Sequence, residues 1–128
     1  MPSEHAIDVE QRLVRIRMWG TITRAEIMAI RRRVADDPRF GSGYSELIDL
    51  QDLTSTVDIT TADVRALASS SSTVDPVLRR AFITTDAATF GLARMFEAYR
   101  SMHRGPEQIE VFSSAAAAEA WLAGWQNA

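Results

Sequence analysis

Residues 13–38 read LVRIRMWGTITRAEIMAIRRRVADDP and place a strand, a break and a helix in direct succession. The first half alternates apolar residues with arginines, which predicts a strand with one face toward a core. Gly20 closes that strand, and Thr23 with Glu26 forms a capping box, the pattern that satisfies free amides at a helix start. The helix is expected to end before Pro38. The core face of the strand then carries Val14, Ile16 and Met18.

The helix that follows has an apolar face and a strongly basic remainder. Its buried face is expected to carry Ile27, Ile30 and Val34, which recur at helical spacing. Residues 31–33 are all arginine, and successive helical residues turn by about 100 degrees, so these side chains cannot form one patch. We therefore expect a solvated face. The alternative is that, with Arg15 and Arg17, they gather an acidic partner or a lipid phosphate.

The remaining elements extend this alternation in both directions. Residues 7–10 predict a strand that forms a hairpin with residues 13–19. Further strands are expected over 46–50, 80–84 and 108–112, and helices from Thr60, over 87–103, and after Ser114. The order β-β-α-β-α-β-α-β-α predicts one α/β domain over residues 1–128, with a mixed, mostly parallel sheet and helices packed on it.

Composition excludes several classes of protein. A chain of 128 residues without cysteine is a single globular domain and no disulfide scaffold. The net charge of −3 argues against a nucleic-acid partner. No stretch approaches the roughly 18 apolar residues of a membrane span, and the polar residues 3–5 are unlike a signal peptide, so a cytoplasmic location is expected.

Five segments carry a resemblance to a known family. They are WGTIT (19–23), LIDL (47–50), GLARMF (91–96), VF (111–112) and AWL (120–122). Together with the element order they resemble the STAS-like family of small bacterial proteins related to anti-sigma-factor antagonists. The resemblance covers nearly the whole chain and implies a STAS-like α/β sandwich.

The resemblance also implies a site at the start of the second helix, where partner-switching STAS domains carry a phosphorylated serine or threonine. The matching stretch is VDITTA (57–62), with Thr60 and Thr61 as phospho-acceptors or partner contacts beside Asp58. The family's Asp-Ser-Ser-Gly signature is absent, because Ile59 intervenes and Ala62 stands where glycine is expected. A branch of the family has ties to CRAL-TRIO lipid-binding domains.

Two functions follow from this resemblance. The first is a regulatory or protein-interaction module, with a protein partner or a second copy in a homodimer. The second is a carrier or sensor of an apolar or amphipathic, lipid-like ligand, whose tail would lie against Phe90, Met95, Phe96 and Tyr99 on the third helix. A core face is the other reading of this apolar stripe. An internal cavity of a few hundred cubic ångströms would favour the carrier.

Polar residues gather where the parallel strands are expected to end. This polar rim consists of Asp52, Thr54, Thr85 and Asp86, and it could meet the polar head of a ligand. The same residue types are also favoured as helix caps and in turns, which is the role we expect for most of them.

Catalysis and metal binding have little support in the sequence. Asp49 and Asp52 are expected to point to opposite faces of a strand, so they make a poor acid–base pair. His5 and His103 have no metal-ligating neighbours at useful spacing. We expect no enzyme, no cofactor and no metal; an enzyme using Asp49 or Asp86 is a weaker alternative.

The last helix carries two tryptophans one turn apart, Trp121 and Trp125. Trp121 is expected to lock this helix onto the sheet as a buried side chain. Trp125 either packs in the same way or forms part of a homodimer surface.

Overall fold

The computed structural model describes residues 2–70, 78–102 and 107–126, which form one mixed sheet and four helices. The strands lie in the order of the chain: β1 (Ser3–Asp8), β2 (Leu13–Thr21), β3 (Ser45–Ser55), β4 (Arg79–Ile83) and β5 (Gln108–Phe112). The helices are α1 (Arg24–Asp36), α2 (Thr61–Ser70), α3 (Ala87–Ser101) and α4 (Ala115–Gln126). β1 pairs antiparallel with β2, and all other neighbours pair in parallel. The predicted order of elements is confirmed.

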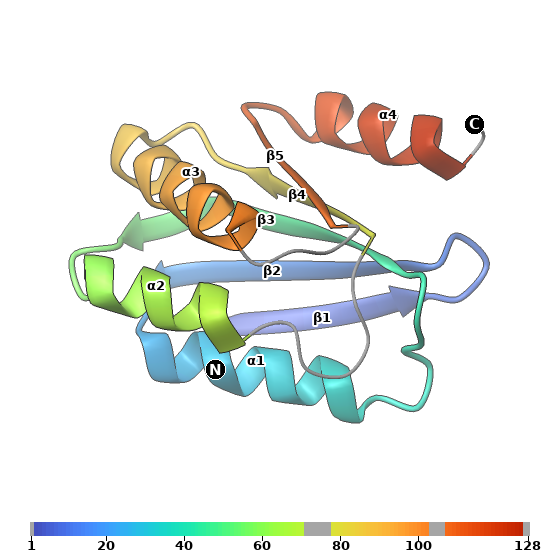
Figure 1. Ribbon diagram of the computed structural model, residues 1–128, viewed down its shortest axis with the longest axis horizontal. Coiled ribbons are helices and arrows are strands. Elements are labelled where there is room, and N and C mark those ends of the chain that lie inside the picture. Colours follow the sequence, from blue (N-terminus) through green and yellow to red (C-terminus); the bar gives the residue numbers. More distant parts are fainter. Residues whose placement is uncertain (1, 71–77, 103–106, 127–128) are drawn as a thin grey trace.

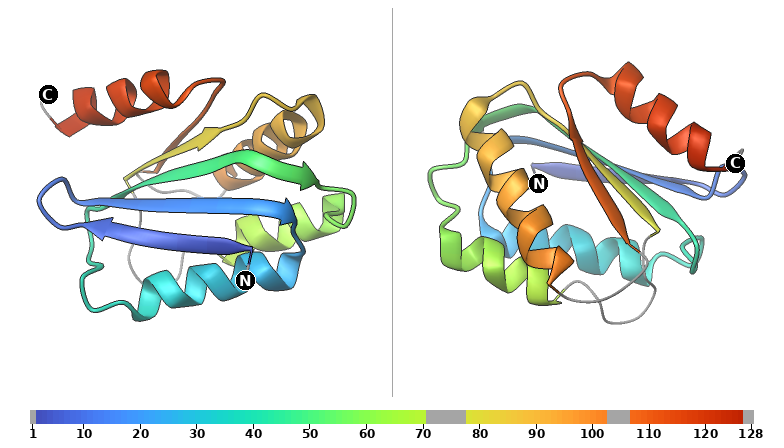
Figure 2. Two further views of the ribbon diagram at one scale, coloured as in Figure 1. Left: turned by 180° about the vertical axis from the view of Figure 1, so that it is seen from behind. Right: turned by 45° about the horizontal axis from the view of Figure 1, so that its top comes forward.

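The helices cover the two faces of the sheet unequally. α1, α2 and α3 lie on one face and α4 on the other (Figures 1 and 2). Because β2 to β5 follow one another in one direction across the sheet, crossovers of the same hand bring the three connecting helices to the same face. The face under α1, α2 and α3 is referred to below as the three-helix face.

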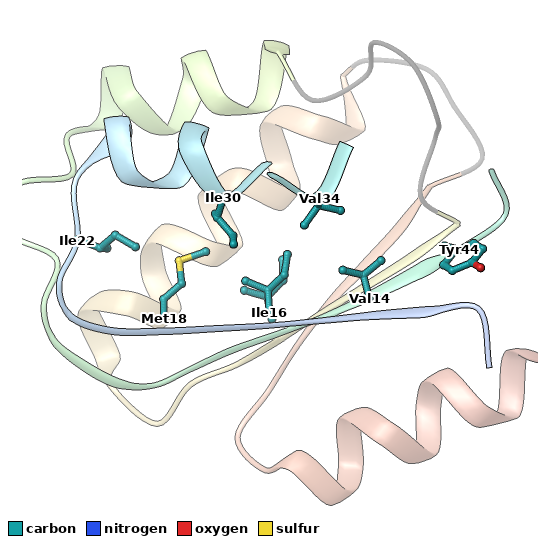
Figure 3. Packing of buried hydrophobic residues seen from close by; sticks show 8 residues of the cluster. Val14, Ile16, Met18, Ile22, Ile30, Val34 and Tyr44 are labelled. Atoms are coloured by element: carbon teal, nitrogen blue, oxygen red, sulfur yellow. The ribbon is translucent and has the colours of Figure 1, made fainter. Parts of the chain in front are cut away.

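The packing of α1 on β2 follows the pattern expected from residues 13–38. Val14, Ile16 and Met18 project from β2 toward Ile30 and Val34 of α1 (Figure 3). Thr23 is the N-cap: its Oγ1 accepts from the backbone N–H of Glu26, and the Glu26 carboxylate accepts from the Thr23 N–H, both at 3.3 Å. The capping box therefore fixes where α1 begins, and the apolar spacing fixes which face it buries.

The first strand lies earlier in the chain than the alternation predicts. β1 spans Ser3–Asp8 and pairs with β2 from Met18 back to Leu13, whereas Val9 belongs to the turn and is 55% exposed. His5 lies inside β1, and its Nε2 is 3.0 Å from Asp37 Oδ2 at the end of α1. Pairing with β2, rather than local alternation, sets the limits of β1.

β3 is longer than predicted. It runs to Ser55 instead of ending at Leu50, because its second half stays paired with β2 through two irregularities in register. Asp52 and Thr54, expected in the loop after this strand, lie within it. The polar sequence there reads as a loop, but main-chain pairing with a neighbouring strand overrides this preference.

α3 buries a different face from the one that its large apolar residues suggest. Its buried residues are Thr89, Ala93, Phe96 and Arg100, whereas Met102 is 76% exposed. The Glu107 carboxylate, just before β5, compensates the buried charge of Arg100. α3 ends at Ser101; the predicted end at His103 lies outside the described residues.

α4 packs on the second face of the sheet through Ala118 and Leu122, against Leu47, Ala81 and Ile83. Trp121 is half-buried, and its ring centroid lies 5.6 Å from that of Phe112. The side chain of Trp125 lies outside the described residues. Within the described part of the chain, every helix is too short or too polar to span a bilayer.

Candidate functional site

A cavity of about 440 Å³ lies between the sheet and the helices of the three-helix face. Its wall is mostly apolar. The strands contribute Ile16, Met18, Glu46, Ile48, Leu50, Leu53, Arg80 and Phe82; the helices contribute Ile27, Ile30, Arg31, Val34, Ala35, Asp36, Val64, Leu67, Thr89, Leu92, Ala93 and Phe96. The cavity opens partly to solvent, and its volume lies in the range of binding sites for small molecules.

The cavity extends along the direction of the strands. Glu46 near the start of β3 and Leu53 near its end both line it, seven residues apart. At about 3.3 Å per residue, they are separated by roughly 20 Å along the strand. Ile22 and Ile59 line the cavity beside Leu53, so this end is apolar, whereas the Glu46 end carries charged side chains.

The charged end is built from side chains of two neighbouring strands. Glu46 and Arg80 are register partners on β3 and β4, and Arg80 Nε donates to Glu46 Oε1 at 2.8 Å. Arg80 Nη1 donates to Glu107 Oε1, also at 2.8 Å. Arg100 of α3 completes the ion pairs through Nη2, which donates to Glu107 Oε2 at 2.6 Å. The Arg80 side chain is only 6% exposed, so these charges are held inside the protein.

Two arginines also cap the C-terminal end of α2. Arg31 Nη1 donates to the carbonyl oxygen of Leu67 at 2.8 Å, and Arg100 Nη1 donates to that of Ala68 at 2.9 Å. The last carbonyls of a helix have no partner within the helix, and positive charge is favoured at this end. The arginines therefore connect α1, α2 and α3 at the charged end of the cavity.

Charges of both signs gather at this end of the cavity. They include the arginines Arg31, Arg80 and Arg100 and the glutamates Glu46 and Glu107. Burial, followed by repulsion from Arg80, lowers the pKa of Arg31 to about 10 despite the attraction of Glu46. The guanidinium carbons of Arg31 and Arg80 each lie 5.6 Å from the ring centroid of Phe96, whose π face attracts cations.

One donor group of this cluster has no partner among the described residues. Arg80 makes its hydrogen bonds through Nε and Nη1, and its Nη2 donates to no atom in the described part of the chain. Arg80 is itself a wall residue of the cavity.

Comparison with known proteins identifies the fold. No protein-family model matches the sequence, and no curated protein matches it significantly. A crystal structure of an uncharacterized DUF3478-family protein from Shewanella loihica PV-4, described as having a SpoIIAA-like fold, is similar to this chain, with a TM-score of 0.60 and 18% identity. The similarity covers 94% of this chain and 93% of the other. The fold is SpoIIAA-like. This confirms the STAS-like α/β fold that the sequence predicted.

The SpoIIAA-like arrangement places only one of the four expected pocket residues on the cavity wall. Phe96 lines the cavity; Phe90, Met95 and Tyr99 do not. Phe90 is 44% exposed, and Met95 and Tyr99 pack at the margin of the core beside α2. The reason is the face that α3 buries, which carries Thr89, Ala93 and Phe96.

The expected polar rim does not line the cavity either. Asp52 accepts a hydrogen bond from Arg17 Nη2 at 2.8 Å, and Thr54 is exposed on β3. Thr85 is exposed, and Asp86 is the N-cap of α3, accepting from the Thr89 N–H at 2.9 Å. The charged end of the cavity lies instead near the start of β3 and β4, opposite to the expected position.

The residues expected as phospho-acceptors or partner contacts are together at the start of α2. Thr60 Oγ1 accepts from the Asp63 N–H at 3.1 Å, and Asp63 Oδ2 accepts from the Thr60 N–H at 2.9 Å. The predicted cap at Thr60 is therefore present. Asp58, Thr60 and Thr61 are all exposed on the surface of the SpoIIAA-like fold.

The charged residues at the cavity were missed in the sequence, although two of them carry a signal. Arg31 follows Ile27 by four positions and precedes Val34 by three, so it belongs to the inner face of α1. Glu46 shares the parity of Ile48 within β3, which places it on the same face. In both elements, a charged residue stands where the hydrophobic pattern calls for an apolar one. This is the signal that could have identified Arg31 and Glu46 as cavity residues.

The carboxylates weighed for acid–base work are engaged locally. Asp49 Oδ1 accepts from the Gln51 N–H at 2.9 Å, and Asp86 caps α3. Within the described residues, no group of three or more potential ligands could hold a metal ion. His103, for which no metal-ligating neighbours were expected, lies outside the described residues.

Proposed function

We propose that this domain binds a small apolar or amphipathic molecule in the cavity of the three-helix face and acts as a carrier or sensor without catalysis of its own. The supporting observation is the cavity itself, about 440 Å³ in volume and lined mainly by Ile, Leu, Val, Met and Phe. Sites for small molecules are typically about 300–1,000 Å³ and mostly apolar. This function agrees with the ties to lipid-binding domains that the family resemblance implies.

The dimensions of the cavity suit a single hydrocarbon chain. An apolar cavity of about 150 Å³ accommodates benzene, so 440 Å³ has room for on the order of a dozen carbon atoms. The length of roughly 20 Å along β3 suits an extended chain better than a compact ring system. Burial of the chain would be driven by the hydrophobic effect.

The test measures how dodecanol displaces the neutral dye N-phenylnaphthylamine from the protein. The fluorescence of the dye reports its displacement. Ala93 lines the cavity from α3, and Ala93→Leu adds side-chain volume there. We expect this variant to bind both molecules at least about tenfold more weakly. Ala98→Leu is the matched control, because Ala98 is exposed on the same helix and binding should not change.

Three outcomes would contradict the proposal. The wild-type protein binds neither molecule, or the two alanine variants bind equally well, or Ala98→Leu has the larger effect. The midpoint of urea unfolding, measured for both variants, separates loss of binding from loss of the folded state.

A second candidate function is the regulatory or protein-interaction module, with a homodimer as its simplest form. It is favoured by the exposed surface at the start of α2, where Val57 is 79% exposed beside Asp58, Thr60 and Thr61. Val57 is the apolar side chain that a partner would cover at this surface.

Light scattering after size-exclusion chromatography tests this candidate. If this surface forms a homodimer, the wild-type mass is that of two chains and Val57→Asp reduces it to one. Val9→Asp is the control, because Val9 is also exposed but lies in the turn between β1 and β2. A wild-type monomer at high concentration, or equal effects of both changes, would contradict the homodimer.

A further inference from the structure

Two polar atoms at the cavity wall have no partner in the described part of the chain. Arg80 and Glu46 both line the cavity, and their side chains are only 6% and 12% exposed. Arg80 donates through Nε and Nη1, and Glu46 accepts through Oε1. Among the described residues, Arg80 Nη2 and Glu46 Oε2 therefore make no hydrogen bond. The first is a donor and the second an acceptor.

This pair forms only half of the usual contact between an arginine and a carboxylate. Such groups often meet through two parallel hydrogen bonds. Arg39 and Asp37 of this chain do so, with Nε donating to Oδ1 at 3.1 Å and Nη2 donating to Oδ2 at 2.8 Å. Arg80 makes only the Nε bond to Glu46, at 2.8 Å. The second bond, from Nη2 to Oε2, is not made, so a donor and an acceptor are left on neighbouring side chains.

We infer that the ligand of this cavity is a single-chain amphiphile with a hydroxyl head, which accepts from Arg80 Nη2 and donates to Glu46 Oε2. This inference rests on the proposed ligand-binding function and specifies the ligand class. A hydroxyl suits the two atoms because its single oxygen both donates and accepts. The tail follows β3 along the apolar wall toward Leu53 and Ile59.

The charges around this position favour a neutral head over an ion of either sign. Arg80 is already held by Glu46 and Glu107, at 2.8 Å each. The wall also carries the carboxylate of Asp36, at the end of α1, and the guanidinium group of Arg31. A carboxylate head would be repelled by Glu46 and Asp36, and an ammonium head by Arg80 and Arg31. A hydroxyl carries no net charge and avoids both costs.

The head position is preorganised by contacts outside the cavity wall. Glu107, which is not a wall residue, holds Arg80 Nη1, and the guanidinium carbon of Arg80 lies 5.6 Å from the ring centroid of Phe96. Glu46 is held in turn by Arg80 Nε and by the register of β3 with β4. A hydroxyl would therefore bind without first ordering these side chains. A ligand without a polar head would displace water from both atoms and replace none of its hydrogen bonds, which lowers affinity.

The first experiment compares dodecanol with its isomer undecyl methyl ether on the wild-type protein, by displacement of N-phenylnaphthylamine. The ether has the same atoms, but its oxygen only accepts and cannot donate to Glu46. We expect dodecanol to bind at least about tenfold more tightly, the factor for one hydrogen bond to a charged group. Dodecanoate and dodecylamine are both charged at neutral pH and are expected to bind more weakly than dodecanol.

The outcomes separate this inference from the proposed function. If the ether binds as tightly as dodecanol, recognition of a hydroxyl is overturned and the apolar cavity stands. If dodecanoate or dodecylamine binds at least as tightly as dodecanol, the neutral head is overturned. If neither the dye nor any of the probes binds, the proposed function fails together with this inference.

The second experiment tests Glu46 directly. Glu46→Gln keeps an oxygen that can accept from Arg80 Nε but puts an N–H donor in place of the free acceptor. We expect the affinity for dodecanol to fall about tenfold while that for the ether does not fall, so the preference for the alcohol disappears. Glu110→Gln is the matched control, because Glu110 is exposed on β5, and it should keep the preference.

A preference for dodecanol that survives in Glu46→Gln would contradict the inference, as would an equal loss for both probes, which indicates a structural role alone. The wild-type comparison of dodecanol with the ether remains decisive if this variant does not fold.

Discussion

Glu46 and Arg80 occupy partner positions on the adjacent parallel strands β3 and β4, and a hydrogen bond of 2.8 Å joins Glu46 Oε1 to Arg80 Nε beneath three helices. Their side chains are 12% and 6% exposed. Burial alone would lower the pKa of Arg80, but the carboxylates of Glu46 and Glu107 hold it above its ordinary value. Arg80 therefore stays charged, and with Glu46 it sets the polarity of one end of the cavity.

Glu46→Gln is expected to lower the free energy of unfolding by about 3 kcal/mol, because removal of one partner leaves a buried charge uncompensated. The measurement is urea denaturation followed by circular dichroism. Glu110→Gln is the control: Glu110 is exposed on β5, and its replacement should change stability by less than about 0.5 kcal/mol. If Glu46→Gln and Glu110→Gln lower the free energy of unfolding by equally small amounts, water already screens the Glu46–Arg80 pair.

Thr60→Ala is expected to cost about 1 kcal/mol, since it removes the hydroxyl that accepts the Asp63 N–H at the start of α2. Thr61→Ala is the matched control, because Thr61 is the first helical residue and is exposed. Thermal unfolding of both variants decides the point. An unchanged midpoint for Thr60→Ala, or the same loss in both, would remove Thr60 from the capping role.

Two substitutions in α4 test how firmly it is docked. Leu122 is 3% exposed, and Leu122→Ala should cost about 3 kcal/mol. Full burial of Trp121 would predict a loss of about 3–5 kcal/mol for Trp121→Ala. Because the side chain is only half-buried, the expected loss is about 2 kcal/mol. Losses below about 1 kcal/mol for both variants, measured by urea unfolding, would show that α4 does not pack on the sheet as described.

The carboxylate of Asp86 makes stability depend on pH in acid. The Thr89 N–H and then the Thr89 hydroxyl hold the pKa of Asp86 below its usual value of 3.8. The contribution of this group is therefore present above pH 4 and is lost as the pH falls through the lower folded-state pKa. Asp86→Asn keeps a capping acceptor but does not titrate.

We therefore expect the difference in stability between wild type and Asp86→Asn to shrink as the pH is lowered from 5 to 2. Urea midpoints measured at intervals across this range provide the test. A difference that stays constant with pH would show that Asp86 has the same affinity for protons in the folded and unfolded chains.

The helix starts could be predicted from the sequence because each depends on a few neighbouring residues. The hydroxyl of Thr23 and the carboxylate of Glu26 bond the backbone of the same turn, and Thr60 with Asp63 repeats the arrangement. Strand ends were less predictable. β3 continues to Ser55 because β2 offers backbone partners there, and no local pattern records the length of a neighbouring strand.

The sequence by itself determined the order of strands and helices, their caps, and the SpoIIAA-like α/β class, because local periodicity and right-handed crossovers leave few alternatives. Only the tertiary structure decided where the cavity lies and which charges face it. Arg31, Glu46 and Arg80 come from three separate elements, and α3 turns Thr89, Ala93 and Phe96 inward rather than Phe90, Met95 and Tyr99. Such positions depend on how whole helices and strands pack, and packing sums many weak contacts between residues that are distant in sequence.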